Sequence, residues 1–204
     1  PDLMRAHNHV MNKFGYPTKS TEEIRNLVGQ GAGAMLGRSI WGQAKKEFGK
    51  VQDEKIKKEM VKDFVDFYGK NIVNESTLIK GVKNFLIWCK ENKISMAVCT
   101  NKQEHLAIDL LKKIGIYDFF EYVAGHNTFE YCKPDPRHLT SVVEILGGDI
   151  KKTLMIGDSE TDANAAKNAG IPVILLEDGY TEKNISEIYH NHLVKDFIGI
   201  EKIV

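Results

Sequence analysis

The sequence lacks an excess of charge of either sign, and it lacks long apolar runs. Its 204 residues contain 28 Lys plus Arg and 28 Asp plus Glu, so the formal net charge is zero. Partners such as nucleic acids or membrane surfaces normally require a basic excess or patch. The longest apolar runs, Leu154 to Ile156 and Ile171 to Leu176, are far shorter than the roughly 20 residues that span a bilayer. We therefore expect no nucleic-acid partner and no membrane partner, and the oligomeric state stays open.

Cysteine is scarce, with only Cys89, Cys99 and Cys132, and no two of these form a CxxC pair. This spacing indicates neither a zinc site nor a disulfide framework. The N-terminal residues also lack the basic start and apolar stretch of a secretion signal. Together these absences predict reduced thiols in a cytoplasmic protein.

Residues 1 to 77 show helical patterns and no convincing strand. Ser20 is followed three residues later by Glu23, which is the form of a capping box at the start of a helix. Apolar residues recur at helical spacing between Ile56 and Tyr68, in an otherwise charged sequence that predicts an amphipathic helix. Leu3 to Phe14 is also expected to be helical. These patterns predict a separate helical domain over residues 1 to 77.

Residues 78 to 204 alternate between helical patterns and short apolar runs. The runs expected to be strands are Ile94 to Cys99, Phe119 to Ala124, Leu154 to Ile156 and Val173 to Leu176. Helices of about ten residues are expected between them, as in parallel sheets that are covered on both faces. The fold class predicted is α/β, with a Rossmann-like parallel sheet as its core.

Polar residues with chemistry in common follow three of these segments. Thr100 and Asn101 follow the first strand, Lys133 follows the second strand region, and Asp158 with Asp162 follows the third. In open parallel sheets, ligands bind at the carboxyl ends of the strands, so these side chains should share one rim. Hydrogen-bond donors, an ammonium and a carboxylate pair are the groups that phosphate chemistry and a divalent metal require.

The order and spacing of these residues resemble the haloacid dehalogenase superfamily of hydrolases. Thr100, Lys133 and Gly157-Asp158 with Asp162 match its second, third and fourth motifs, at separations of 33 and 25 positions between Thr100, Lys133 and Asp158. The segment KPDPRHL, which begins at Lys133, is especially similar to bacterial phosphoglycolate phosphatases, and GDSETD follows it in the expected order. The helical residues 1 to 77 would correspond to the cap domain of that subgroup, and residues 78 to 204 to its α/β core.

The resemblance implies a role for each matched residue. Thr100 and Asn101 would bind the phosphoryl oxygens, and Lys133 would neutralise charge on the phosphoryl group and on the nucleophile. Asp158 would bind Mg²⁺, while Asp162 would complete the metal site from the next shell of residues. Carboxylate oxygens are the ligands that Mg²⁺ prefers, so this assignment is chemically reasonable.

The first motif of the family, an apolar strand ending in Asp-x-Asp, has no match before Leu78. That motif supplies the aspartate that attacks phosphorus. Pro1-Asp2-Leu3 instead resembles the residues that usually follow it. We therefore expect the nucleophile to lie upstream of Pro1, and the 204-residue chain by itself to be inactive.

The function that the resemblance implies is Mg²⁺-dependent hydrolysis of a small phosphomonoester, with 2-phosphoglycolate as the first choice of substrate. Alternatives on the same scaffold are another phosphatase, a sugar-phosphate mutase, a pyrophosphatase or a dehalogenase. The acidic pair in GDSETD argues against the dehalogenase, because dehalogenation needs no metal. An alternative of another class is a phosphate-binding protein that has lost catalysis with its nucleophile.

Three further features have ordinary structural explanations. Residues 29 to 33, Gly-Gln-Gly-Ala-Gly, lack the preceding strand of a phosphate-binding loop and predict a turn between helices. The His-Asn-His segments at residues 7 to 9 and 190 to 192 are expected to be surface histidines on helical or loop segments. Arg38 could bind a substrate carboxylate or form an ordinary salt bridge, and the sequence leaves both open.

Overall fold

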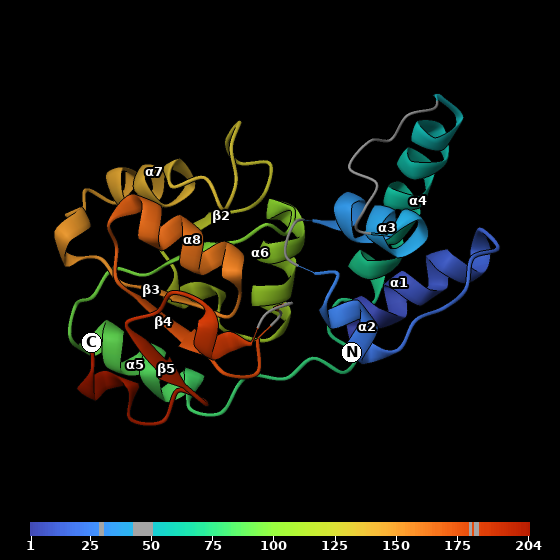
Figure 1. The fold of residues 1–204 in the computed structure, drawn as a ribbon. Helices are drawn as coiled ribbons and strands as arrows, with labels where there is room; N and C mark the ends of the chain where they lie inside the picture. The colour runs from blue at the N-terminus through green and yellow to red at the C-terminus, as the bar shows by residue number, and fades with distance from the viewer. Residues whose placement is uncertain (29–30, 43–50, 180, 182–183) are drawn as a thin grey trace. The chain divides into compact units, whose positions relative to one another are not determined.

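The computed structural model describes residues 1–28, 31–42, 51–179, 181 and 184–204, and the side chains of residues 51–54 are outside this description. The chain divides into two compact units, Pro1–Ser76 and Thr77–Val204 (Figure 1). The predicted turn at residues 29 to 33 lies partly outside the described residues, since it includes Gly29 and Gln30.

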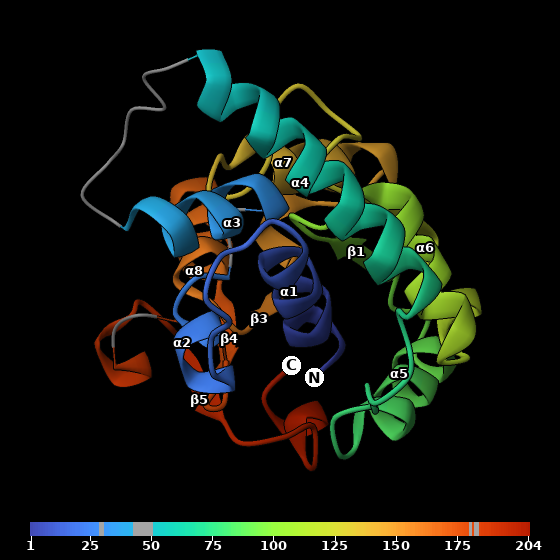
Figure 2. The ribbon, with the colours of Figure 1, turned by 90° about the vertical axis from the view of Figure 1, so that its right-hand side faces the viewer.

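The described part of the first unit is helical. Its helices are α1 (Asp2–Lys13), α2 (Thr21–Arg25), α3 (Ala32–Trp41) and α4 (Val51–Lys70). Helix α4 packs against both α1 and α3, as Figure 2 shows. Apolar side chains from these three helices are nearly inaccessible to solvent, and the most buried are Val10, Met11, Leu36 and Met60. The amphipathic patterns of the sequence therefore form one small helical core.

The capping box predicted at Ser20 is present. The Ser20 hydroxyl accepts a hydrogen bond from the Glu23 N–H at 3.2 Å, and the Glu23 carboxylate accepts the Ser20 N–H at 2.8 Å. Helix α2 begins directly after Ser20. Two N–H groups that the first turn would otherwise leave unpaired are thus satisfied within four residues.

The second unit contains strands and helices in alternation. Its strands are β1 (Ala97–Cys99), β2 (Tyr122–Ala124), β3 (Met155–Gly157), β4 (Val173–Leu176) and β5 (His192–Val194). Its helices are α5 (Val82–Glu91), α6 (Glu104–Lys113), α7 (Arg137–Ile145) and α8 (Glu160–Ala169), with short 3₁₀ turns at Tyr117–Phe119, Ile150–Lys152, Ile185–Glu187 and Ile200–Lys202. All described strand pairs are parallel, which confirms the predicted α/β class.

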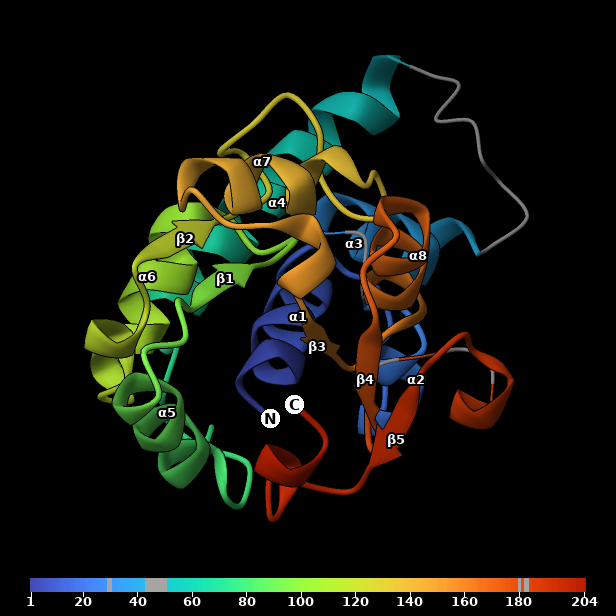
Figure 3. The ribbon, with the colours of Figure 1, turned by 90° about the vertical axis from the view of Figure 1, so that its left-hand side faces the viewer.

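The strands form two sheets rather than the single sheet expected from the sequence. One sheet pairs β1 with β2, and the other has the order β3-β4-β5 (Figure 3). Within the described residues, β1 and β3 therefore each have one edge without a strand partner. Their residues are only partly buried, whereas all four residues of β4 are buried. An additional parallel strand would cover such open edges of β1 and β3.

Side chains under both sheets belong to connected apolar clusters. Val173 and Leu175 of β4 pack with Ala163 and Ala166 of α8, while Ile174 packs on the opposite face with α5. A parallel strand buried on both faces requires such a continuous apolar run, which β4 has. Met96 contacts both the cluster that covers β2 and the cluster that contains Ile174. Shared core side chains therefore join the two sheets.

Strand β5 is an element that the sequence analysis missed. His192, which was interpreted as a surface histidine on a helix or loop, is exposed but begins this strand. Asn191 explains the pairing, because its side chain accepts the Val173 N–H at 2.8 Å just before β5 joins β4. His7 likewise differs from the expected surface residue, since it is fully buried and its Nε2 lies 2.9 Å from Ser39 Oγ.

Across the described residues, no helix combines the length and apolar character needed to cross a membrane.

Candidate active site

Lys133 is the centre of the site. Its side chain is buried, and its ammonium donates a hydrogen bond of 2.6 Å to the carbonyl of Cys99, the last residue of β1. The same ammonium forms an ion pair with the buried carboxylate of Asp162, in the first turn of α8. One cation thus joins the end of β1 to the start of the helix that follows β3, which the sequence separates by more than 60 positions.

Asp162 has a partner for each of its oxygens. Oδ1 accepts the Lys133 ammonium, and Oδ2 accepts the Asp158 N–H at 3.1 Å and the Ser159 hydroxyl at 2.8 Å. Ser159 accepts the Asp162 N–H in return at 3.3 Å, so the pair also forms the capping box of α8. Burial acts to raise the pKa of Asp162, but the Lys133 ammonium and these hydrogen bonds outweigh it and lower the pKa. This geometry matches a supporting residue that orients its neighbours.

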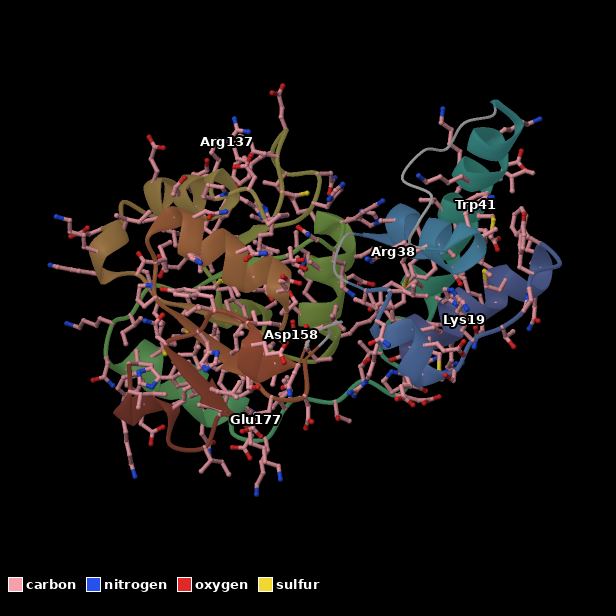
Figure 4. The ribbon with its side chains drawn as sticks, in the orientation of Figure 1. Lys19, Arg38, Trp41, Arg137, Asp158 and Glu177 are labelled. Carbon is pink, nitrogen blue, oxygen red and sulfur yellow. The ribbon has the colours of Figure 1, made fainter. Side chains whose placement is uncertain are left out.

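Asp158 lies directly after β3, where Figure 4 labels it. Burial and the negative charge of Asp162 raise its pKa to about 7, although Lys133 acts in the opposite direction. A pKa this high means that the surroundings stabilise the ionised carboxylate of Asp158 poorly. A cation beside it would stabilise this ionised form. Asp158 is therefore the better suited of the two carboxylates to hold a metal ion.

Two glycines allow the chain to pass close to these carboxylates. A Cβ on Gly157 would lie 2.5 Å from Asp162 Cβ, and one on Gly179 would lie 1.7 Å from the Asp158 carbonyl oxygen. Only glycine fits at such distances. Gly157 belongs to the motif that the sequence singled out, whereas the approach of Gly179 from the loop after β4 was not foreseen.

Thr100 and Asn101 follow β1 on the same side of the sheet as Lys133. The Thr100 N–H continues the ladder to Ala124 at 2.9 Å, and its hydroxyl accepts the Lys102 N–H at 3.1 Å. A hydroxyl that accepts one hydrogen bond can still donate another to a ligand. The Asn101 amide donates to the Lys133 carbonyl at 2.7 Å, so it ties the loop after β1 to the segment that contains Lys133.

The structure thus joins Asn101, Lys133, Asp158 and Asp162 in one hydrogen-bonded network, and Thr100 directly follows Cys99, whose carbonyl accepts the Lys133 ammonium. The part of the chain that the structure describes holds no group of three or more His, Cys, Asp or Glu side chains placed to bind a metal ion. Within these residues the site holds two carboxylates, Asp158 and Asp162, and one buried cation, Lys133.

Two other titratable groups, Cys99 beside Lys133 and Asp2 in the first unit, are unsuited to nucleophilic chemistry. Burial raises the pKa of the Cys99 thiol to about 11, despite the nearby Lys133 ammonium. All three cysteines are free. In the first unit, Asp2 is 1% exposed and its carboxylate accepts hydrogen bonds from the segment Asn74–Ser76, which excludes it as an accessible attacking group.

Comparisons with known proteins identify the family. Residues 1–176 match the family model of haloacid dehalogenase-like hydrolases. The chain belongs to this family. The prediction made from the ordered motifs is thereby confirmed, and the chain is a hydrolase of the phosphoglycolate phosphatase-like kind.

Curated relatives and a solved structure agree with this assignment. The chain is 34% identical to a phosphoglycolate phosphatase of Caulobacter vibrioides over 202 residues, which cover 99% of this chain and 83% of the relative. It is 33% identical to one of Mesorhizobium japonicum over 197 residues, covering 97% of this chain and 85% of the relative. The crystal structure of a predicted phosphoglycolate phosphatase from Haemophilus somnus 129pt superposes with a TM-score of 0.89 at 30% identity, covering 100% of this chain and 90% of that one.

Proposed function

We propose that the protein is a Mg²⁺-dependent phosphomonoester hydrolase whose substrate is 2-phosphoglycolate, a small phosphorylated metabolite. The observation on which this depends is the buried Lys133 ammonium, held between the Cys99 carbonyl and Asp162 at the ends of β1 and β3. The relatives named phosphoglycolate phosphatase support this choice of substrate.

Lys133 would stabilise negative charge on the phosphoryl group as it is transferred. Its ammonium is fixed by two partners before substrate arrives, so little reorganisation is needed when charge develops. The Thr100 hydroxyl would donate to a phosphoryl oxygen, and Asn101 would hold the Lys133 segment in place while also facing the phosphate. Each of these roles uses a group that the fold already orients.

Asp158 would hold the Mg²⁺ ion. Its carboxylate suits a hard cation that prefers oxygen ligands, and a bound cation would offset the burial and the negative charge of Asp162 that raise its pKa. Asp162 would support it by accepting the Asp158 N–H and fixing Lys133. When bound, Mg²⁺ would polarise the phosphoryl oxygens and neutralise part of their charge.

The nucleophile would be an aspartate upstream of Pro1, on a strand that occupies the open edges of β1 and β3. Its carboxylate would attack phosphorus, the alcohol would leave, and water would then hydrolyse the aspartyl-phosphate. Residues 1 to 77 would serve as the helical cap domain and residues 78 to 204 as the core.

The test compares the 204-residue chain with a version extended by its native upstream residues, assayed side by side with Mg²⁺ and 2-phosphoglycolate. None of Thr100, Lys133 and Asp158 can replace an attacking carboxylate, so we expect no significant turnover from the 204-residue chain. The extended version should reach the usual enzymatic range of about 1–10³ per second. Omission of Mg²⁺ from the extended version is the internal control.

Robust activity of the 204-residue chain would show that the nucleophile has been misplaced. An extended version that contains an Asp-x-Asp but hydrolyses other phosphomonoesters much faster would overturn the choice of substrate and leave the reaction intact. An extended version that binds phosphate without turnover would favour the non-catalytic alternative.

A further inference from the structure

His138 is a buried polar residue that the proposed mechanism does not use. It stands in the first turn of α7 and is 0% exposed. Neither of its ring nitrogens has a hydrogen-bond partner among the described residues. Buried polar groups without partners cost folding free energy and are rare, so the position of this ring calls for an explanation.

The ring of His138 contacts the loop that contains Lys133. This loop, residues 125–136, runs from the end of β2 to the start of α7. The ring forms a T-shaped contact with Phe129, at a centroid distance of 5.8 Å and an interplanar angle of 81°. The Gly125 carbonyl lies near enough to raise the pKa of the ring, although without the geometry of a hydrogen bond. His138 therefore touches both the beginning and the middle of the loop.

The loop has little freedom at its beginning. A Cβ on Gly125 would lie 2.3 Å from the Glu104 nitrogen, so the backbone there is pressed against α6. Later in the loop, Tyr131 stacks on Phe129 at 5.5 Å and its hydroxyl lies 2.7 Å from Ser141 Oγ on α7. The fully buried ring of His138 packs against Phe129 of this loop. A change in its volume must therefore move the loop or leave a cavity.

The charge of the ring also bears on Lys133. Burial lowers the pKa of His138 to about 4, and the charges of Lys133 and His126 act in the same direction, while Asp135 opposes them. The ring is therefore neutral at physiological pH. A protonated ring would place a second buried cation near Lys133.

We propose that His138 is a positioning residue for Lys133, acting as a spacer that sets where the loop of residues 125–136 places the ammonium. The positioning of Lys133 by His138 is inferred from the contacts above. Only the expected effect on catalysis rests on the proposed function. An ordinary core residue would affect stability, whereas a spacer of this kind must also affect the environment of Lys133.

The first measurement needs no activity. In the 204-residue chain with ¹³C-labelled lysine, the Cε–Hε cross-peak of Lys133 is assigned by its loss in Lys133→Arg. We expect His138→Ala to move this peak toward those of exposed lysines, because the loop relaxes into the vacated space. His138→Leu, with a similar volume and no charge, should keep the wild-type position. His105→Ala, at an exposed histidine on α6, is the matched control and should leave the peak unchanged.

The second measurement uses the version extended upstream. His138→Ala should lower kcat by about 10–100-fold with a smaller effect on KM, the scale expected when a catalytic group is displaced by about 1 Å. His138→Leu should restore most of kcat. Below pH 5 the Lys133 peak should shift further in the wild type than in His138→Leu, because only the wild-type ring gains a proton there. A purely structural role would lower stability without this split between kcat and KM.

A folded His138→Ala chain with an unmoved Lys133 peak would overturn the proposal, and so would His138→Leu that behaves like His138→Ala. If His138→Ala fails to fold, the milder truncation His138→Val takes its place with the same two expectations. If the peak moves as expected while the extended version hydrolyses no phosphomonoester, the proposed function fails and the placement of Lys133 by His138 stands.

Discussion

At the scale of single residues, the Lys133 ammonium acts on the pKa values of two carboxylates, Asp158 and Asp162. Lys133 binds Asp162 directly and lowers its pKa against the effect of burial. Asp158 lies close enough to feel both charges, and burial with the charge of Asp162 leaves its pKa at about 7. Two carboxyls four positions apart thus have pKa values shifted in opposite directions.

The assignment of Asp158 predicts the effect of Asp158→Asn in the version extended upstream. The amide keeps the shape and loses the charge, so Mg²⁺-dependent turnover should be abolished or greatly weakened. Steady-state rates across a Mg²⁺ titration check this. Asp118→Asn, at an exposed aspartate in the turn before β2, should leave the rates unchanged. Wild-type rates of Asp158→Asn at saturating Mg²⁺ would refute the assignment.

Lys133→Ala should lower the rate of the extended version by about 10²–10³, the scale for losing one electrostatic stabiliser of the transition state. The loss also leaves Asp162 buried with an uncompensated charge, so the free energy of unfolding should be measured alongside. Lys152→Ala is the control, because Lys152 is exposed in a turn before β3. A folded Lys133→Ala variant with undiminished kcat would rule out the proposed role.

At the scale of elements, side chains fix the ends of helices in both units. Ser20 with Glu23 begins α2, and Ser159 with Asp162 begins α8. The second capping box shares Asp162 with the site, so the start of α8 and the position of Lys133 depend on the same carboxylate. Local helix geometry and the geometry of the site are therefore coupled there.

Asp2 performs a similar task over a longer distance in the first unit. From the start of α1, its carboxylate accepts the backbone N–H groups of Asn74, Glu75 and Ser76 at 2.9–3.2 Å and the Ser76 hydroxyl at 2.7 Å. Burial acts to raise the pKa of Asp2, but these hydrogen bonds lower it overall. The segment after α4 is thus held against the first helix by one side chain.

Asp2→Ala should reduce the free energy of unfolding by about 1–3 kcal/mol, because several N–H groups lose their acceptor in a buried position. Denaturant unfolding of the 204-residue chain measures this. Asp109→Ala is the control, since Asp109 forms an exposed pair with Lys113 on α6 and should cost about 0–1 kcal/mol. Equal effects of the two substitutions would show that the Asp2 cluster adds no stability.

At the scale of the whole molecule, two groups act in opposite directions on stability at mildly acid pH. The folded pKa of His138 is about 4, below the ordinary 6.5, so acid favours the unfolded chain between these values. The folded pKa of Asp158 is about 7, above the ordinary 3.8, so acid favours the folded chain over that interval. The two contributions have opposite signs and similar size.

We therefore predict that the contributions of His138 and Asp158 to the unfolding free energy of the wild type nearly cancel between pH 6.5 and 4. A variant that lacks the His138 ring should expose the contribution of His138. The stability of the wild type relative to His138→Leu should fall by on the order of 3 kcal/mol as pH drops over this interval, at about 1.4 kcal/mol per pKa unit. Urea unfolding of both chains at several pH values, without divalent metal, provides the measurement. A pH-independent difference would mean that the ring titrates normally in the folded chain.

Features that depend on neighbouring residues were readable from the sequence. The Ser20–Glu23 capping box lies within one turn, and the apolar run of β4 has the same bounds in the sequence and in the structure. The positions of Thr100 directly after β1 and of Asp158 directly after β3 were also readable, because each follows a short apolar run.

Features that depend on distant residues were decided only by tertiary structure. His192 begins a strand because β4 offers it an edge, and its own sequence has no strand pattern. Lys133 and Asp162 form a buried pair across 29 positions, and the pKa of Asp158 follows from that pair and from burial. The sequence by itself thus determined which chemical groups are present and in what order. Their charge states, and the burial of His138 beside them, were set by packing, because desolvation and Coulomb interactions depend on distances in space rather than along the chain.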